Sequence, residues 1–132
     1  MSAFLTPLSV ELLTDEGGFD LKTRNGRQLW RVVDHPFVYQ SDVAGKILTI
    51  PVGFVTDFAS IPIALSSVFG DIGQRAGLPH DFEYSKKGSL DRATADAVLK
   101  EACIVSGVSA IKANAIYAGV RAFGWMFFRK GD

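Results

Sequence analysis

The residue types able to carry out chemistry gather in one stretch, residues 79–96, which reads PHDFEYSKKGSLDRATAD. His80 and Tyr84 are four positions apart, so a helix places them on one face. Asp96 belongs to a second predicted helix, and Gly88 lies midway between His80 and Asp96. A helical hairpin folded at Gly88 therefore predicts an imidazole facing a carboxylate, the arrangement of a histidine general base.

The rest of this stretch supports a hairpin. Asp81 is turned about 100° away from His80, where it can bind a cation or face water. Gly88 suits a positive φ in the turn, and Ser89 or Asp91 can cap the second helix. The alternative is structural: the histidine caps a helix, and the aspartates bind backbone amides.

Two other polar segments are candidates. In the segment TDFAS, residues 56–60, Asp57 and Ser60 either hold the loop and a helix start or take part in chemistry. Ser60 has no glycine-flanked elbow, so the chemistry of a serine hydrolase has little support. His35 precedes Pro36 in a predicted turn, with no acidic companion, and we interpret it as structural.

Alternating apolar residues and turn signals predict a small antiparallel sheet in the first half. The expected strands cover residues 7–13, 19–22, 27–33, 37–41 and 46–52. The pair Asn25-Gly26 is a strong hairpin signal between two of them, and residues 42–45 form a second turn.

Helical spacing and alanine-rich segments follow from Gly53 onward. The expected helices cover residues 60–69, 72–85 with a lost backbone bond or a helix restart at Pro79, 93–105 ending at Gly107, and 109–125 capped by Ser109. The second of these ranges leads into the hairpin. In the last helix, small residues should allow close packing along the stripe Ile111, Ala115, Ala118, Ala122 and Trp125. We predict one α+β domain over 1–132, β-rich to about residue 53 and helical from about residue 54.

Composition narrows the classes of function. The chain has 132 residues, 48% of them hydrophobic, which suffices for a core. Lys and Arg balance Asp and Glu at 14 each, so we expect no nucleic-acid partner. Neither a signal peptide nor a transmembrane segment is recognisable, which predicts a soluble protein. The single cysteine, Cys103, is expected to be buried.

An aromatic cluster closes the chain at residues 122–130, with the sequence AFGWMFFRK. Such a cluster is usually core or a protein interface, and a membrane-facing patch is the alternative.

Four segments in order, PVGFVTDFASIP, PHDFEY, DRATAD and YAGVRAFGW, resemble a family of tailed-phage and prophage proteins, domain of unknown function 1353. The resemblance covers about residues 37–125 and implies a phage origin without a known activity. Together with the absence of a recognisable signal peptide, it implies a location in the host cytoplasm or the virion. Pro79 departs from the family, which usually has an aliphatic residue at this position.

The hairpin alone is also similar to the core of phospholipase A2 enzymes, especially the viral type without disulfides. That resemblance implies His80 as the base that activates water, Asp96 as its partner, Tyr84 as a donor to Asp96, and Asp81 as a calcium ligand. Those enzymes complete the calcium shell with a glycine-rich loop, and the nearest candidate here is Gly70–Gly73.

Two classes of function therefore stay open. The first is a phage hydrolase that uses His80 and Asp96, with or without calcium, on a phospholipid or cell-envelope ester. The second is a non-enzymatic phage component that binds other phage proteins in a tail, in assembly, in host interaction or in lysis.

Overall fold

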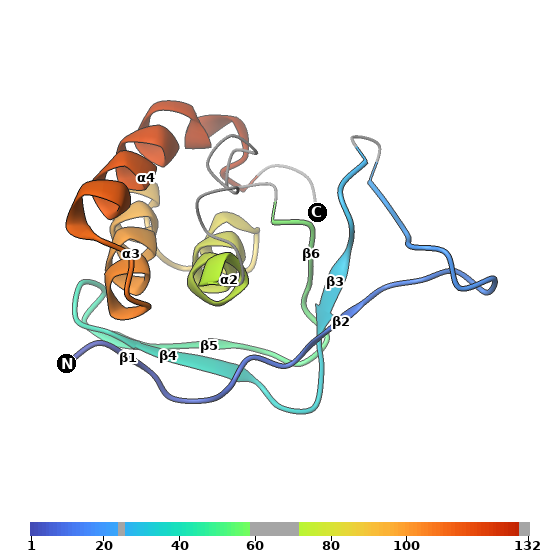
Figure 1. Ribbon diagram of the computed structural model, residues 1–132. Coiled ribbons are helices and arrows are strands. Elements are labelled where there is room, and N and C mark those ends of the chain that lie inside the picture. The colour runs from blue at the N-terminus through green and yellow to red at the C-terminus, as the bar shows by residue number, and fades with distance from the viewer. Residues whose placement is uncertain (24–25, 59–71, 130–132) are drawn as a thin grey trace.

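A computed structural model describes residues 1–23, 26–58 and 72–129. Its strands are β1 Ala3–Phe4, β2 Val10–Leu12, β3 Trp30–Val32, β4 Phe37–Ser41, β5 Lys46–Ile50 and β6 Val55–Thr56. The helices are α2 Ile72–Tyr84, α3 Arg92–Val105 and α4 Ala110–Phe123, followed by the 3-10 turn η1 Gly124–Met126. Strands precede helices, so the predicted α+β class is confirmed (Figure 1). The helix expected over residues 60–69 lies outside the described residues.

The strands form two antiparallel sheets, in the orders β1-β4-β5 and β2-β3-β6. The predicted hairpin of β4 and β5 is confirmed, with a register that runs from Phe37 opposite Ile50 to Ser41 opposite Lys46. Phe37, Tyr39 and Ser41 are buried while the residues between them are only half-buried. This alternation is expected when one face of a strand covers a core.

The N-terminal strands are shorter than predicted. The strand expected over residues 7–13 is only β2, and the segment 19–22 makes two isolated bridges, Thr14 with Asp20 and Lys22 with Gln28. Phe19 and Leu21 in this segment are exposed, so alternation is present without a core to bury it. Because these side chains are not buried, residues 19–22 form isolated bridges and not a continuous strand.

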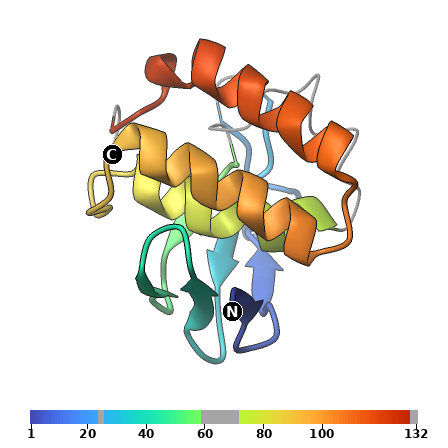
Figure 2. The same ribbon diagram turned by 90° about the vertical axis from the view of Figure 1, so that its left-hand side faces the viewer.

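The helices pack in chain order, α2 on the sheets, α3 on α2 and α4 on α3. Helix α2 lies over both sheets, where Leu78 joins a core cluster with Phe37, Ile50 and Phe54. Helix α3 contacts both α2 and α4, and the α3/α4 pair covers the side opposite the segment around residues 13–22 (Figures 1 and 2). Within the described ranges, no helix has the length and apolar content needed to cross a bilayer.

Local signals set the helix ends. Asp91 caps α3 by accepting a hydrogen bond from the amide of Thr94, and Ser109 caps α4 by accepting one from the amide of Lys112. Gly107 has a φ of 97° after the end of α3. All three expectations are confirmed. Of the two alternatives at Pro79, the restart is wrong, because α2 runs through this buried residue, and proline without an amide hydrogen only removes one backbone hydrogen bond.

The face of α4 that packs differs from the prediction. The stripe Ile111, Ala115, Ala118, Ala122 and Trp125 is exposed, with Ile111 at 83%. Instead Ala113, Ile116 and Val120 are buried. Both stripes have helical spacing, so only the position of α3 decides which one is covered. In the aromatic cluster, Phe127 and Phe128 pack on the core while Phe123 and Trp125 are exposed.

Candidate functional site

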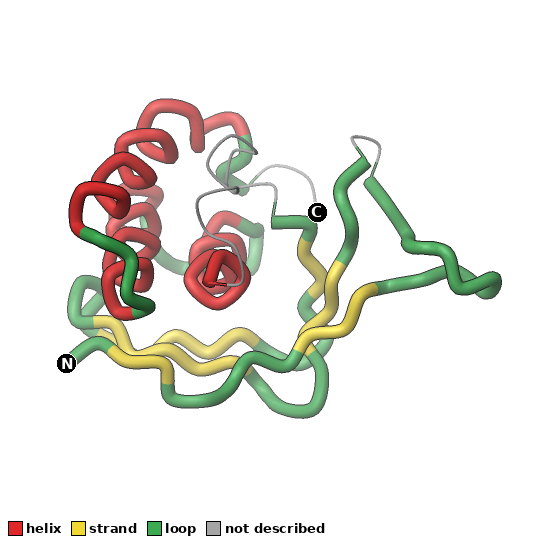
Figure 3. The backbone as a smooth tube through the Cα atoms, viewed as in Figure 1, coloured by secondary structure: helices red, strands yellow, loops and turns green. Residues whose placement is uncertain are grey.

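The helical hairpin brings the predicted pair together. Nε2 of His80 on α2 lies 2.8 Å from Oδ1 of Asp96 on α3, and both side chains are 0% exposed. Helices α2 and α3 run side by side as the hairpin requires (Figure 3). The predicted contact is therefore confirmed, while the catalytic role stays a prediction.

Tyr84 completes this contact from the same face of α2. Its hydroxyl donates to the same Oδ1 of Asp96 at 2.5 Å, and its ring centroid lies 4.2 Å from that of His80. Burial, and then the hydrogen bond to Asp96, raise the pKa of Tyr84 above its usual value. The phenol therefore stays protonated and serves as a donor.

Two arginines hold the other oxygen of Asp96. Nη1 of Arg121 on α4 donates to Oδ2 at 2.9 Å, and Nη1 of Arg92 lies 3.6 Å from the same atom. Burial by itself raises the pKa of Asp96, but the hydrogen bonds from His80 and Tyr84, together with the nearby positive charges, outweigh it and lower the pKa. Asp96 is thus an ionised carboxylate at the junction of the three helices α2, α3 and α4.

Arg121 was not predicted as a site residue. The signal that could have found it is a basic residue in the last turn of α4 after six residues without charge, AIYAGV. Arg92 also links α3 to α4 directly, because its Nη1 donates to the backbone oxygens of Val120 and Arg121, each at 3.2 Å. These bonds fix the end of α4 against the start of α3.

Glycine is needed in the turn of the helical hairpin for a different reason from the one predicted. Gly88 does not have the positive φ that we expected. A Cβ at Gly88 would instead lie 2.2 Å from the backbone oxygen of Glu83. The buried carboxylate of Glu83 accepts from the amides of Ser89 and Leu90, each at 2.8 Å. Close approach to α2, rather than backbone conformation, therefore requires glycine here.

Asp81 faces the joint between sheet and helices, since its Oδ2 accepts a hydrogen bond from the hydroxyl of Thr56. Asp57 follows Thr56 at the end of β6 and is half-buried. Two segments distant in the sequence thus meet beside His80. Ser60 lies outside the described residues. Nδ1 of His35 lies 3.0 Å from the backbone oxygen of Pro36 in a turn, in keeping with a structural role.

The described residues do not form a calcium site. They contain no group of three or more His, Cys, Asp or Glu side chains able to hold a metal ion. One oxygen of Asp81 is already engaged by Thr56. Calcium needs about six to eight oxygen ligands, and the loop expected to supply some of them, Gly70–Gly73, begins outside the described residues, so Asp81 as a calcium ligand stays a prediction.

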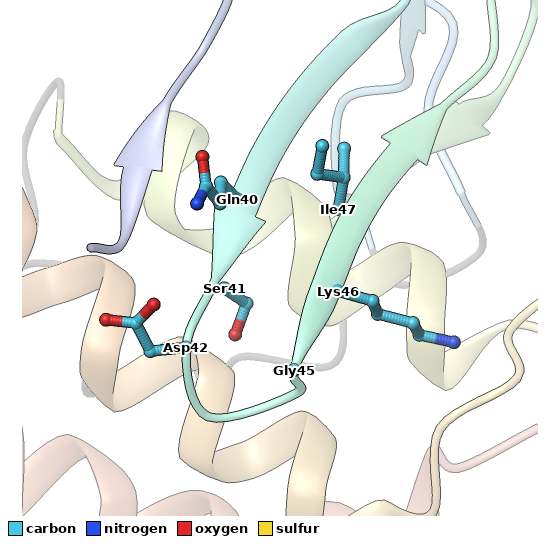
Figure 4. A pocket seen from close by; sticks show the side chains of 6 residues that line it. All are labelled: Gln40, Ser41, Asp42, Gly45, Lys46 and Ile47. Atoms are coloured by element: carbon cyan, nitrogen blue, oxygen red, sulfur yellow. The ribbon is translucent and has the colours of Figure 1, made fainter.

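Two surface hollows lie away from His80. One, of about 280 Å³, sits at the β4–β5 turn between Gln40 and Ile47 (Figure 4). The other is a groove of about 580 Å³ between this turn, the N-terminus, α3 and α4. Neither hollow is lined by His80, Tyr84 or Asp96.

Comparison with known proteins identifies a family whose function is unknown. Residues 30–120 match the family described as protein of unknown function (DUF1353). No curated protein and no solved structure matches the chain. The match runs from the start of β3 into α4 and includes His80, Tyr84, Arg92 and Asp96, while Arg121 lies one residue beyond it. Because it covers well over half of the sequence, the chain belongs to the DUF1353 family of proteins of unknown function.

Proposed function

We propose that this protein is a small phage-encoded hydrolase that acts on a phospholipid or cell-envelope ester, with His80 as its general base. The observation that supports this proposal is the hydrogen bond between Nε2 of His80 and the ionised Asp96. In this proposal, the carboxylate at Nε2 holds a proton on that nitrogen, which makes Nδ1 the ring atom that accepts a proton in the reaction. Tyr84 holds the same carboxylate oxygen and fixes its orientation.

The reaction follows from this tautomer. Nδ1 of His80 takes a proton from water as the water oxygen bonds to the ester carbonyl carbon. The tetrahedral intermediate then collapses, the carbon–oxygen bond to the alcohol breaks, and Nδ1 returns the proton to the leaving alkoxide. Asp96 stays ionised throughout and stabilises the imidazolium.

The cost of the buried charge also favours a function. Replacing a buried ion network by apolar side chains of similar volume is often neutral or stabilising. Stability alone therefore does not account for an ionised Asp96 that is 0% exposed and tied to His80 and Arg121. Groups held in this way are common where a protein tunes an acid or a base.

A second candidate function is a non-enzymatic phage component. The observation that favours it is the burial of His80, which is also 0% exposed. In this alternative, the ion network only holds the three helices together while other surfaces bind phage proteins. Catalysis, by contrast, requires that a substrate reach Nδ1 through a movement of the groups that cover it.

His80→Gln separates the two candidates, with His35→Gln as the matched control because these are the two histidines of the chain. Hydrolysis of phospholipid vesicles and simple esters is measured together with the melting temperature. For a hydrolase, we expect His80→Gln to fold and to lose activity by about 10² or more. An inactive wild type, together with a His80→Gln variant destabilised by about 1–3 kcal/mol, would instead favour the non-enzymatic phage component. His35→Gln should change neither property.

A further inference from the structure

We propose that this protein attaches to anionic phospholipid bilayers through a surface at the end of α4, the α4-end patch. The patch consists of exposed apolar side chains and of cations beside them, namely Phe123, Trp125, Met126, Arg129, Lys86 and Lys87. This partner deepens the proposed hydrolase and rests on it, since a phospholipid hydrolase acts at the surface that holds its substrate. Binding can be measured without hydrolysis, so the two proposals fail separately.

The apolar part of the patch is exposed although a core lies close by. Phe123, Trp125 and Met126 are 55%, 57% and 43% exposed, while the next residues, Phe127 and Phe128, pack on the core. The three exposed side chains belong together because η1 begins where α4 ends. Large apolar side chains that gather at one place on a surface mark an interaction site.

Contacts with the helical hairpin hold the patch in place. A Cβ at Gly124 would lie 2.2 Å from the hydroxyl oxygen of Tyr84, and the ring of Phe128 meets the Tyr84 ring edge-on at a centroid distance of 5.1 Å. The amide of Arg129 donates to the backbone oxygen of Tyr84, and its guanidinium donates to that of Leu90. The patch therefore has a fixed position next to the candidate site.

Cations lie beside the exposed rings. Lys86 and Lys87 are exposed in the turn between α2 and α3, and Arg129 reaches the same turn from the end of the chain. The ammonium of Lys46 on β5 lies 3.0 Å from the hydroxyl of Ser89 in this turn. At the left of Figure 2, the chain descends from η1 to the turn. Apolar side chains and positive charges are thus neighbours at one end of the helical part.

The acidic groups described near the patch are already engaged. Residues 110–129 contain no acidic residue. The carboxylate of Asp91 accepts from the amide and the hydroxyl of Thr94 at the start of α3, where the helix dipole offsets its charge. Glu83 is buried and binds the amides of the turn, and Asp42 pairs with the N-terminal ammonium at 3.1 Å. The charge that the patch presents outward is therefore positive.

This combination fits a bilayer better than a protein or a nucleic acid. Lysine is depleted in protein interfaces, although aromatic residues are enriched there. Nucleic-acid binders carry an excess of positive charge, whereas this chain balances 14 basic with 14 acidic residues. At a membrane interface, Trp and Phe side chains enter the headgroup region while lysines contact anionic lipids. Aromatic residues flanked by lysines therefore identify an anionic phospholipid surface.

Cosedimentation with vesicles tests the proposal. Diether phosphatidylglycerol, mixed in equal parts with diether phosphatidylcholine, provides an anionic surface without ester bonds. The wild type should bind these vesicles, less so as salt is added and less so without phosphatidylglycerol, because salt screens the attraction. A wild type that does not sediment with the anionic vesicles would overturn the proposal, even if it hydrolyses soluble esters. Binding without any ester hydrolysis would support the patch and count against the hydrolase alone.

The apolar contact is located by two matched variants. Trp125→Ser should weaken binding by about tenfold, the scale of one partly buried apolar side chain. Ile111→Ser, at an 83% exposed position at the other end of α4, should bind like wild type. Trp30→Phe leaves Trp125 as the only tryptophan, and vesicles with brominated chains should then quench its fluorescence. Unchanged binding of Trp125→Ser, or an unquenched Trp125, would refute insertion of the patch.

The cations are tested in the same way. Lys86→Gln with Lys87→Gln should weaken binding by about thirtyfold, the effect of removing two cations at an anionic surface. Lys22→Gln with Lys112→Gln makes the same change in net charge at exposed positions outside the patch and should bind like wild type. Circular dichroism verifies the fold of each variant. Equal losses in both double variants would contradict the patch, and binding to a single-stranded RNA instead of vesicles would assign it to nucleic acid and overturn the proposal.

Discussion

The carboxylate of Asp96 lies 2.8 Å from Nε2 of His80 across the α2–α3 interface, and neither side chain is exposed. The other carboxylate oxygen accepts a hydrogen bond from Arg121 of α4. One side chain therefore connects three helices. Stability, pH dependence and activity should all respond to changes at this carboxylate.

Asp96→Asn should lower the free energy of unfolding by about 3–5 kcal/mol at neutral pH, because it leaves buried charged partners uncompensated. The pKa of Asp96 is lowered in the folded state, so its contribution is present above the unfolded value of about 3.9 and is lost as the pH falls through the folded value. The difference from wild type in urea denaturation should therefore shrink in acid. Glu16→Gln, at an exposed position, is the control. A difference independent of pH would show that Asp96 is not ionised in the fold.

Tyr84→Phe should cost about 1–3 kcal/mol, because it removes the hydroxyl that donates to Asp96 and keeps the ring that packs on His80. In the hydrolase proposal, it should also reduce activity less than His80→Gln does, since Tyr84 only positions the carboxylate. Urea denaturation and ester hydrolysis measure the two effects. Tyr117→Phe is the control, because Tyr117 lies on α4 away from Asp96. Equal effects of both substitutions would remove Tyr84 from the network.

Gly88→Ala should destabilise the protein by about 1–3 kcal/mol, because the new Cβ would meet the backbone oxygen of Glu83 at 2.2 Å. Gly45→Ala is the comparison, since Gly45 has open space around it and a φ of 69°. It therefore reports the conformational cost alone, about 1 kcal/mol. Thermal unfolding measures the stability of both variants. A Gly88→Ala variant as stable as wild type would show that the turn can move away from α2.

Cys103 should be unreactive in the folded protein. Its side chain is 0% exposed, and burial raises the pKa of the thiol to about 12. Because the thiolate is the reactive form, alkylation at mildly basic pH should be slower by roughly 10³-fold than in the urea-unfolded chain. Mass spectrometry after timed iodoacetamide treatment measures both rates. Rapid labelling without urea would mean that α3 opens locally on the timescale of the reaction.

Features that depend on neighbours in the chain were predictable from the sequence. The β4–β5 hairpin follows from alternation and a turn, and the caps Asp91 and Ser109 follow from hydrogen bonds within three residues. The contact of His80 with Asp96 was predictable for the same reason. A hairpin folded midway between two residues brings them to the same height, whatever the rest of the chain does.

Features that depend on packing between distant elements were decided only by the tertiary structure. Two stripes on α4 have the same helical spacing, and the position of α3 selects the one with Ile116. Arg121 reaches Asp96 only because α4 folds back over α3. Likewise, whether Phe19 is core or surface depends on which elements lie over residues 13–22, which alternation cannot specify. The sequence by itself determined the helices α2 to α4, the β4–β5 hairpin and the contact between His80 and Asp96. The tertiary structure determined their partners, because burial and charge are properties of all the elements that surround a residue.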